Sequence, residues 1–434
     1  MLSSFKSRSS PVFSCLLILI FVFYLRIIYE DYEIVNEGNS QWSVPDLNRN
    51  LYDKGIVVCA NEDSDAIMTG IQYIIRKVRT TFNSNIYIEI AHCSEISLST
   101  QLSIRNSYSN ILFNNICDKA STVQKKRLRG WFCKPMALIT SSFNETMVID
   151  TDTLWFKNPV DLFSSYGYIE TGGLFFRDRL LYELKDEINN PNYDQRNGLR
   201  FKDVLTFIET HNPNFKLTAD KALELYNNNG ASYYWKHVYN NSSPVLRQVQ
   251  ESSVVIMNRN KMPKTTQVIS KILPSFGLGY GDKEIYWIAA TIANEIFSWE
   301  PYIAGIYGDC GEIFHYSPLK KYEQGADVSP YFINAEYLVQ ITTDKDGRGI
   351  QNQISKPISA SNFELFEMGE YFKQTGGRCG ACARMGCQVV PDYVNSEILS
   401  YQRYQRENVA SKISMMDKVK KSMKSLLSKL LEYI

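Results

Sequence analysis

The residues best suited to chemistry are two aspartates, Asp150 and Asp152, which directly follow the apolar run Met147-Val-Ile149. Ligands in open α/β sheets bind beyond the carboxyl ends of strands, so carboxylates at this point can reach a bound group. Two carboxylates one residue apart repel each other, but they can share a hard divalent cation. Such a cation also binds the two phosphates of a nucleoside diphosphate and stabilises it as it leaves. The pair therefore predicts a metal-assisted site for a nucleotide-linked substrate.

Two other interpretations of the acidic pair have to be weighed. An apolar strand ending in Asp-x-Asp is also typical of haloacid-dehalogenase-type phosphatases, whose first aspartate is the nucleophile. That motif has Thr or Val two residues after the second aspartate, where this chain has Leu154. It also needs a later Gly-Asp followed by another aspartate, which the segment Gly281-Asp282-Lys283-Glu284 lacks. An acidic loop that is merely solvated or caps a helix is the remaining alternative.

The elements around the pair alternate between apolar runs and amphipathic stretches, which predicts a mixed, mostly parallel sheet with helices on its faces. The body is thus expected to be α/β. In the first half, strands are expected at residues 55–60, 85–90, 111–113 and 146–149, with helices at 67–78 and 131–141. In the second half, strands are expected at 173–176 and 254–257, and helices at 201–210, 219–226 and 283–296.

An apolar segment at residues 11–29 predicts a single transmembrane helix. Lys6 and Arg8 precede it and acidic residues follow it, which favours a cytosolic tail at 1–10 and a lumenal body, as in a type II signal anchor. A cleaved signal peptide or a buried helix are the alternatives. We expect a stem at 30–54, a catalytic domain at 55–407 and an amphipathic basic helix at 408–434. That last helix is expected to dock on the body, or else to lie on an anionic membrane surface.

Charge and cysteine content narrow the class of protein further. The 434 residues include 47 basic and 46 acidic side chains, for a formal charge of +1, so nucleic acid is not an expected partner. Eight of nine cysteines follow the predicted span, which permits disulfides in an oxidising compartment. The cluster Cys379-x2-Cys382-x4-Cys387 offers only three thiolates, so disulfides are favoured there over a closed zinc site.

Several blocks, taken in order, resemble the fungal-type Golgi α-mannosyltransferases of glycosyltransferase family 71. The similar segments are Gly130-Trp-Phe-Cys-Lys-Pro-Met-Ala137, Val148-Ile-Asp-Thr-Asp152, Thr171-Gly-Gly-Leu-Phe-Phe-Arg-Asp-Arg179, Ser253-Val-Val-Ile-Met-Asn-Arg-Asn-Lys261 and Gly279-Tyr-Gly-Asp-Lys-Glu284. The resemblance covers roughly residues 55–340. The histidine-bearing end of the family's last block is not recognisable, which leaves a third metal ligand open.

The resemblance implies a GT-A-like nucleotide-sugar-binding fold, GDP-mannose as donor, Mn²⁺ as cofactor and a mannose-containing glycan or glycoprotein as acceptor, with retention of the α configuration. It also implies a single-pass type II protein of the Golgi membrane. Asp150 and Asp152 would hold the metal, and Lys134 could contact donor phosphate or ribose. Gly172 and Gly173 would let the backbone approach the donor sugar, or else form a simple turn.

Three further residues receive candidate roles. Asp282 and Glu284 would bind sugar hydroxyls or stabilise positive charge at the anomeric carbon, although Asp282 could instead cap the following helix. His315 is a candidate metal ligand, and a structural histidine is the alternative. A front-face reaction, in which the leaving diphosphate accepts the acceptor's proton, needs no protein base. A UDP-galactose or UDP-glucose donor, or a silent lumenal carbohydrate-binding protein, are the competing functions.

Overall fold

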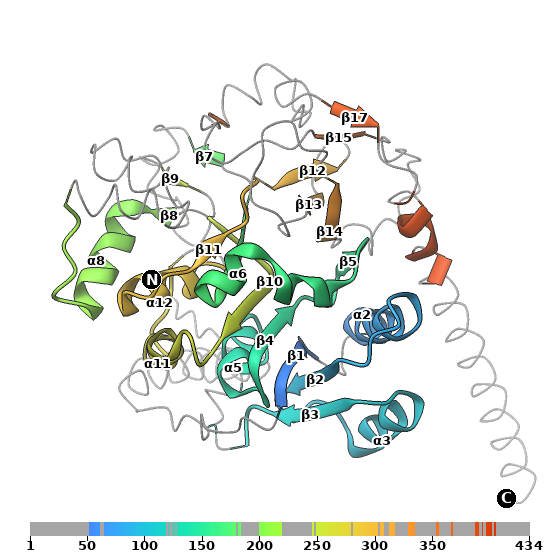
Figure 1. Cartoon of the computed structure of the whole chain (residues 1–434). Coiled ribbons are helices and arrows are strands. Elements are labelled where there is room, and N and C mark those ends of the chain that lie inside the picture. The colour runs from blue at the N-terminus through green and yellow to red at the C-terminus, as the bar shows by residue number, and fades with distance from the viewer. Residues whose placement is uncertain are drawn as a thin grey trace, which may run out of the picture.

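Figure 1 shows the computed structural model of the chain. It describes residues 52–60, 65–118, 120, 125, 128–178, 181–183, 199–218, 245–246, 249–278, 281–302, 304–307, 312–316, 329–334, 353–355, 366–367, 387–389, 393, 396–401 and 403–404. The predicted cytosolic tail, the span at 11–29, most of the stem and the basic helix at 408–434 lie outside these residues. So do the helix expected at 219–226 and the first two cysteines of the predicted cluster. Among the helices that are described, none is long and apolar enough to cross a bilayer.

A seven-stranded sheet in the order β11-β6-β10-β4-β1-β2-β3 organises the body (Figure 1). Four adjacent strands of this sheet run parallel to one another: β3 (Ile111–Asn115), β2 (Tyr87–His92), β1 (Tyr52–Cys59) and β4 (Phe143–Ile149). On the other side of β4 comes β10 (Gln250–Asn258), which is antiparallel both to β4 and to β6 (Gly173–Arg177). The short edge strand β11 (Ser298–Trp299) runs parallel to β6. The prediction of a mixed, mostly parallel sheet is therefore confirmed.

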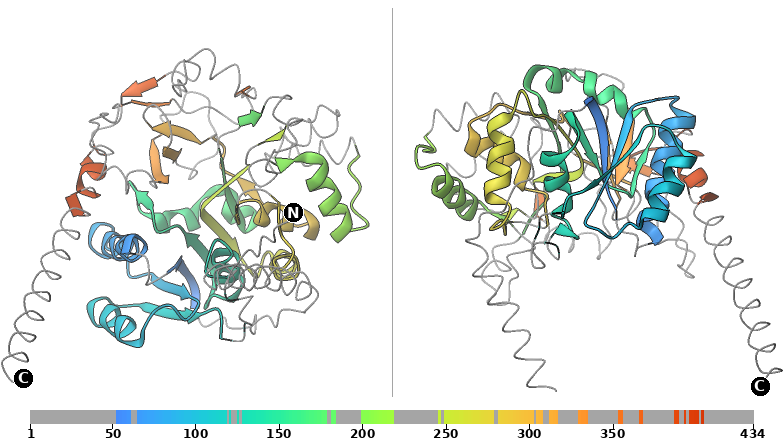
Figure 2. Two further views of the ribbon diagram at one scale, coloured as in Figure 1. Left: turned by 180° about the vertical axis from the view of Figure 1, so that it is seen from behind. Right: turned by 90° about the horizontal axis from the view of Figure 1, so that it is seen from below.

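Both faces of this sheet are buried, and its central strands accordingly contain short continuous apolar runs, such as residues 56–58 in β1 and 147–149 in β4. Along β4, Val148 faces one core, while Met147 and Ile149 face the other. The first core receives side chains from α5 (Cys133–Thr140), α8 (Phe201–His211), α11 (Pro263–Ile272) and α12 (Ile285–Ala293). The second receives them from α2 (Asp65–Arg76), α3 (Leu98–Ser107) and the 3-10 helix η2 (Pro159–Ser164). Figure 2 shows these helices in layers on either side of the strands.

Shorter elements complete the described structure. The π-helical turn η1 (Lys77–Thr81) extends α2, and α6 (Tyr166–Thr171) leads into β6. A second sheet has the order β17-β15-β12-β13-β14-β5. Its strands are Cys387–Val389, Gln353–Ser355, Gly305–Tyr307, Glu312–Tyr316, Pro330–Asn334 and Thr153–Trp155. A third, small sheet has the order β16-β7-β9-β8, with strands Phe366–Glu367, Leu181–Glu183, Val245–Leu246 and Leu199–Arg200.

Two disulfides tie the first half of the body together. Cys59 at the end of β1 is bonded to Cys133 at the start of α5, and Cys93 after β2 is bonded to Cys117 after β3. All four cysteines therefore lie near the carboxyl edge of the parallel strands. The prediction that cysteines of the body form disulfides is confirmed for these four.

Candidate active site

Asp150 and Asp152 lie in the tight turn that joins β4 of the large sheet to β5 of the second sheet. The Asp150 amide donates to the Ser253 carbonyl at 2.8 Å, and the Asp150 carbonyl accepts from the Thr153 amide at 3.2 Å. Gly70 of α2 lets this turn approach closely, because a Cβ there would lie 2.0 Å from the Thr151 carbonyl oxygen. The turn thus holds both carboxylates at the carboxyl edge of the sheet, as the sequence predicts.

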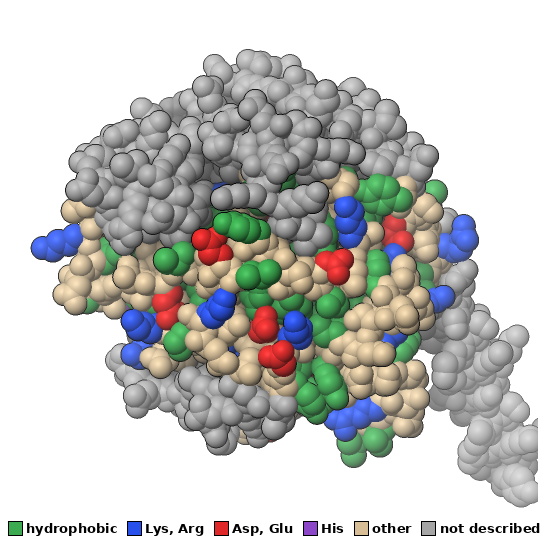
Figure 3. Space-filling model, viewed as in Figure 1, with side chains coloured by type: hydrophobic (Ala, Val, Ile, Leu, Met, Phe, Trp, Pro, Cys, Tyr) green, Lys and Arg blue, Asp and Glu red, His purple; other side chains and the backbone are tan. Residues whose placement is uncertain are grey.

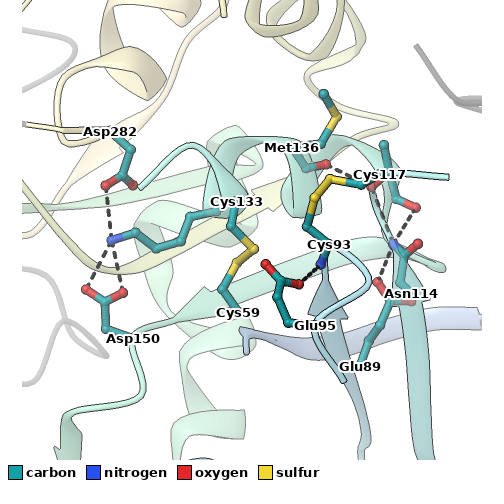
Figure 4. Close-up of a disulfide and its surroundings, with 12 residues drawn as sticks. Cys59, Glu89, Cys93, Glu95, Asn114, Cys117, Cys133, Met136, Asp150 and Asp282 are labelled. Atoms are coloured by element: carbon teal, nitrogen blue, oxygen red, sulfur yellow. Dashed lines mark hydrogen bonds and ion pairs between the residues drawn. A yellow bond between two sulfur atoms is a disulfide. The ribbon is translucent and has the colours of Figure 1, made fainter. Parts of the chain in front are cut away.

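Lys134 brings a positive charge to the same edge. Its ammonium group lies 3.0 Å from each carboxylate oxygen of Asp150 and 3.2 Å from Oδ1 of Asp282 (Figure 4). It also donates to the Ser252 hydroxyl at 2.9 Å. The lysine side chain is only 8% exposed, so its charge is screened little by water. The structure therefore joins three of the residues that the sequence singled out into one network.

The electrostatics of the network follow from burial and from like charges. Burial alone would lower the pKa of Lys134, but Asp150 and Asp282 together raise it above its usual value. Burial and the neighbouring Asp282 raise the pKa of Asp150, although Lys134 opposes the change. Burial and Asp150 raise the pKa of Asp152 to about 7. Ionising both carboxyl groups is therefore unfavourable without a further positive charge, which a bound cation would supply.

Asp282 reaches the Lys134 ammonium from the turn before α12. It is 2% exposed and accepts a hydrogen bond of 2.8 Å from the Tyr286 hydroxyl. Gly281 precedes it with a φ of +69°, a conformation that favours glycine. A Cβ on Gly281 would also lie 2.8 Å from the indole of Trp131. The interpretation of Asp282 as a helix cap finds no support, since no side chain caps α12.

Glu284 is close to Asp282 in sequence but has a different environment. Its carboxylate accepts from the Val249 amide at 2.8 Å and from the Trp287 indole at 2.6 Å. The residue is fully buried, which raises its pKa to about 7, and it is not among those that line the cavity described below. This geometry suits a residue that positions the 281–284 turn.

A cavity of about 570 Å³ opens over this edge of the sheet. Asp150, Asp152, Asp282 and Lys134 contribute to its wall, together with Glu251, Ser252, Lys283 and Asn334 on the β10 side. On the β1 and β2 side the wall is formed by Cys59, Ala60, Ile67, Cys93, Glu95, Leu128, Arg129, Gly130, Trp131 and Cys133. On the face of the molecule shown in Figure 3, acidic and basic side chains are interspersed over the described part.

Sequence reasoning missed four charged residues of this wall, Glu95, Arg129, Glu251 and Lys283. The Lys283 ammonium lies 2.8 Å from Glu251 Oε2 and 2.9 Å from Asp178 Oδ2. Glu251 also accepts from the Asn334 amide at 3.2 Å. Lys283 belongs to a segment that the family resemblance covers, so the resemblance could have drawn attention to it. Glu251 precedes the apolar run of β10 and carries no motif.

The structure does not bring Gly172 and Gly173 to this cavity. Gly173 pairs with Met257, which pairs with Thr146, so Gly173 lies level with the middle of β4 and two strands away from it, not at the carboxyl end where Asp150 follows. Gly172 has a φ of +83° and ends α6 as a left-handed cap. A Cβ would lie 2.6 Å from Lys261 at Gly172 and 2.6 Å from Met262 at Gly173. Close packing and the turn account for both glycines.

His315 is also absent from the residues that line the cavity. It lies on β13, fully buried, and its Nδ1 is 2.7 Å from Glu300 Oε2. Its ring stacks on Phe332 at 4.6 Å, within an aromatic cluster. Within the described ranges, no three His, Cys, Asp or Glu side chains converge as a metal site. The two hard carboxylates of Asp150 and Asp152 still fit a divalent cation whose other ligands come from a diphosphate and water.

The chain was compared with known families and proteins. The model of the family Mannosyl_trans3, described as "Mannosyltransferase putative", matches residues 53–323. The α-1,3-mannosyltransferase MNT2 of Saccharomyces cerevisiae is 22% identical over 273 residues, which are 60% of this chain and 46% of that protein. MNT3 of the same yeast is 26% identical over 197 residues, 41% of this chain and 28% of that protein.

MNN13 of Candida albicans is 27% identical over 206 residues, 46% of this chain and 24% of that protein. The chain thus spans between about a quarter and a half of the length of these three relatives. Among solved structures, the mannosyltransferase Ktr4p from S. cerevisiae is 12% identical, with a TM-score of 0.35 over 59% of this chain and 70% of that chain. A likeness at that score carries no inference.

The sequence relatives confirm the expected resemblance to fungal α-mannosyltransferases. The family match covers nearly all of the large sheet and every one of the four charged residues Lys134, Asp150, Asp152 and Asp282. Because it extends over more than half of the sequence, the chain belongs to the mannosyltransferase family Mannosyl_trans3.

Proposed function

We propose that this protein transfers mannose from GDP-mannose to a mannose-containing glycan or glycoprotein, in a metal-dependent reaction that retains the α configuration. The observation that carries the proposal is the carboxylate pair Asp150 and Asp152, facing a cavity of about 570 Å³ at the carboxyl edge of the sheet. Family membership and the α-1,3-mannosyltransferase relatives support mannose as the sugar. The mixed sheet, with its four parallel strands, fits a GT-A fold.

The residues of the site have separate tasks in this proposal. Asp150 and Asp152 would hold a divalent cation such as Mn²⁺, which supplies Lewis-acid stabilisation of the leaving diphosphate. The Lys134 ammonium binds a phosphate oxygen and neutralises part of the same charge. Asp282 accepts hydrogen bonds from sugar hydroxyls. Glu284 acts indirectly, because it fixes the turn that carries Asp282.

The bonds can be exchanged on one face of the sugar. The acceptor hydroxyl oxygen forms a bond to the anomeric carbon as the bond from that carbon to the diphosphate oxygen breaks. The hydroxyl proton passes to the departing diphosphate, so no protein base is required. Carboxylates on the cavity wall stabilise the positive charge that develops at the anomeric carbon.

The cellular location is part of the proposal. We place the body in the lumen of the Golgi, anchored by the apolar segment at residues 11–29 with a cytosolic N-terminus. Two disulfides in the described part of the chain support an oxidising compartment. Protease protection of the body in sealed Golgi vesicles, with loss of that protection in detergent, is the expected result.

A donor panel tests the activity. The full chain, purified in detergent with Mn²⁺, is offered GDP-mannose, UDP-galactose and UDP-glucose together with mannose oligosaccharides. We expect product only from GDP-mannose, and no product after chelation of the metal or with Asp152→Ala. Turnover of a UDP-sugar alone would assign another donor, and sugar binding without any turnover would identify a silent binding protein.

A further inference from the structure

The two ends of the cavity differ in chemistry. Beyond the Asp150 network, the β10 side presents the charged and amide groups of Glu251, Lys283 and Asn334, which suit the many hydroxyls of a sugar. Among the described residues, the β1 and β2 side presents apolar surface and, on the loop after β2, one carboxylate, Glu95. The apolar surface comes from Ala60, Ile67, Leu128 and Trp131. Apolar and aromatic walls with few polar groups suit a flat heterocycle.

Glu95 is held with its carboxylate in a defined position. Its side chain is 4% exposed and accepts a hydrogen bond from the Cys93 amide through Oε2. Its Oε1 lies 3.4 Å from Nε of Arg129, a residue that is 51% exposed at the rim. A carboxylate has about four acceptor positions on its two oxygens, so these two contacts leave capacity for a further donor.

The spacing of the strands sets the distance between Asp150 and Glu95. Asp150 follows β4, Glu95 follows β2, and β1 lies between these strands. Neighbouring strands are about 4.8 Å apart, so the two positions are separated by about 10 Å across the sheet. In Figure 4 the Cys59–Cys133 disulfide lies between them. This span is comparable with a ribose and one phosphate, which separate a nucleobase from the outer phosphate of a nucleoside diphosphate.

We propose that Glu95 recognises the base of the donor nucleotide and selects guanine. The inference rests on the proposed function, because it takes the diphosphate to lie at Asp150, Asp152 and Lys134. Guanine presents two neighbouring donors, N1–H and the exocyclic amino group, and a carboxylate accepts from both. Uracil presents a single N–H between two carbonyl oxygens, which a carboxylate repels. The same side chain thus attracts one base and rejects the other.

Calorimetry of the full chain with Mn²⁺ and GDP, IDP or UDP tests this assignment. IDP differs from GDP only by the missing amino group. A hydrogen bond to a charged group corresponds to about a tenfold or larger preference, so we expect GDP to bind at least about tenfold more tightly than IDP. UDP should bind more weakly still. With Glu95→Gln the preference for GDP over IDP should fall below about threefold.

The controls separate the possible outcomes. Glu95→Gln keeps an oxygen for the Cys93 amide, and Glu170→Gln, an exposed residue of α6, is the matched control that should keep the preference. Equal binding of GDP and IDP by the wild type would overturn the inference, and this measurement requires no variant. An unchanged preference for GDP over IDP in Glu95→Gln would also overturn it. So would tighter binding of UDP than of GDP by the wild type. Failure to bind any of the three nucleotides would instead refute the proposed donor site.

Discussion

Replacing Lys134 by methionine is the most direct test of the charge network at the site. Methionine has a similar length and an apolar side chain, so the change removes the ammonium charge and leaves most of the volume. In the wild type this ammonium pairs with both Asp150 and Asp282, at 3.0 and 3.2 Å. The variant therefore leaves two carboxylates without their counter-charge.

The expected cost follows from how deeply each carboxylate is buried. Removing one partner of a buried ion pair typically destabilises a protein by about 3–5 kcal/mol. Asp282 is 2% exposed and would bear most of this cost, whereas Asp150 is 29% exposed and can be hydrated in part. We therefore expect a loss of about 3 kcal/mol in the free energy of unfolding. Removing the second charge as well, in Lys134→Met with Asp282→Asn, should restore at least half of it.

Urea unfolding at neutral pH, followed by tryptophan fluorescence, measures these differences. Lys264→Met provides the control, because Lys264 is exposed on α11 and its loss should change stability by less than about 0.5 kcal/mol. A loss below about 1 kcal/mol in Lys134→Met would show that the network is solvated and that the reasoning from burial is wrong. Failure of the double variant to recover stability would show that packing, and not charge, determines the cost.

Three more predictions concern the same region. Asp152→Asn should reduce turnover of GDP-mannose with Mn²⁺ at least about 100-fold without lowering the melting temperature, and unchanged turnover would contradict the role of Asp152. Because burial raises the pKa of Glu284 from 4.5 to about 7, the folded state retains a proton that the unfolded state releases, so stability present below pH 4.5 is lost as pH rises toward 7. Glu284→Gln should remove this loss. As the pH rises from 4.5 to 7, the free energy of unfolding of the variant should therefore increase by up to about 3 kcal/mol relative to that of the wild type, which denaturant unfolding measures. Replacing Cys59 and Cys133 by alanine opens a loop of 74 residues and should cost about 4 kcal/mol, and a loss under 1 kcal/mol by urea unfolding would contradict that expectation.

The sequence predicted the first half of the fold well because its signals there are local. Each parallel strand is a short apolar run, and the strand expected at 146–149 corresponds to β4 (Phe143–Ile149). The strand predicted at 254–257 is also present, as part of β10. No local feature of the sequence, however, predicts that this strand pairs with β4 or that the pairing is antiparallel. Partner and direction depend on contacts between residues about a hundred positions apart. Topology in the second half could therefore not be predicted from patterns.

Some residues of the candidate site could likewise be identified from the sequence, and others could not. Asp150 and Asp152 stand out in the sequence because a strand must end where they begin. Glu251 could not be found, because nothing in its sequence neighbourhood shows that its side chain pairs with Lys283 on the same wall of the cavity. His315 drew attention as a rare residue type, yet its neighbours in space are aromatic rings and Glu300. Rarity of a residue type therefore gave less information than position at a strand end.

The charge balance of the cavity is compatible both with folding and with the proposed binding of a diphosphate. Three carboxylates, those of Asp150, Asp152 and Asp282, gather at one edge of the sheet, and burying them without a counter-charge would oppose folding. Lys134 supplies that counter-charge from a flexible stem with three donors, so it can exchange a carboxylate oxygen for a phosphate oxygen without leaving its place. Each such exchange frees a carboxylate oxygen of Asp150 at the moment when a phosphate arrives. Under the proposed function, the contacts that stabilise the site before the donor binds would therefore be the ones that become available to the donor.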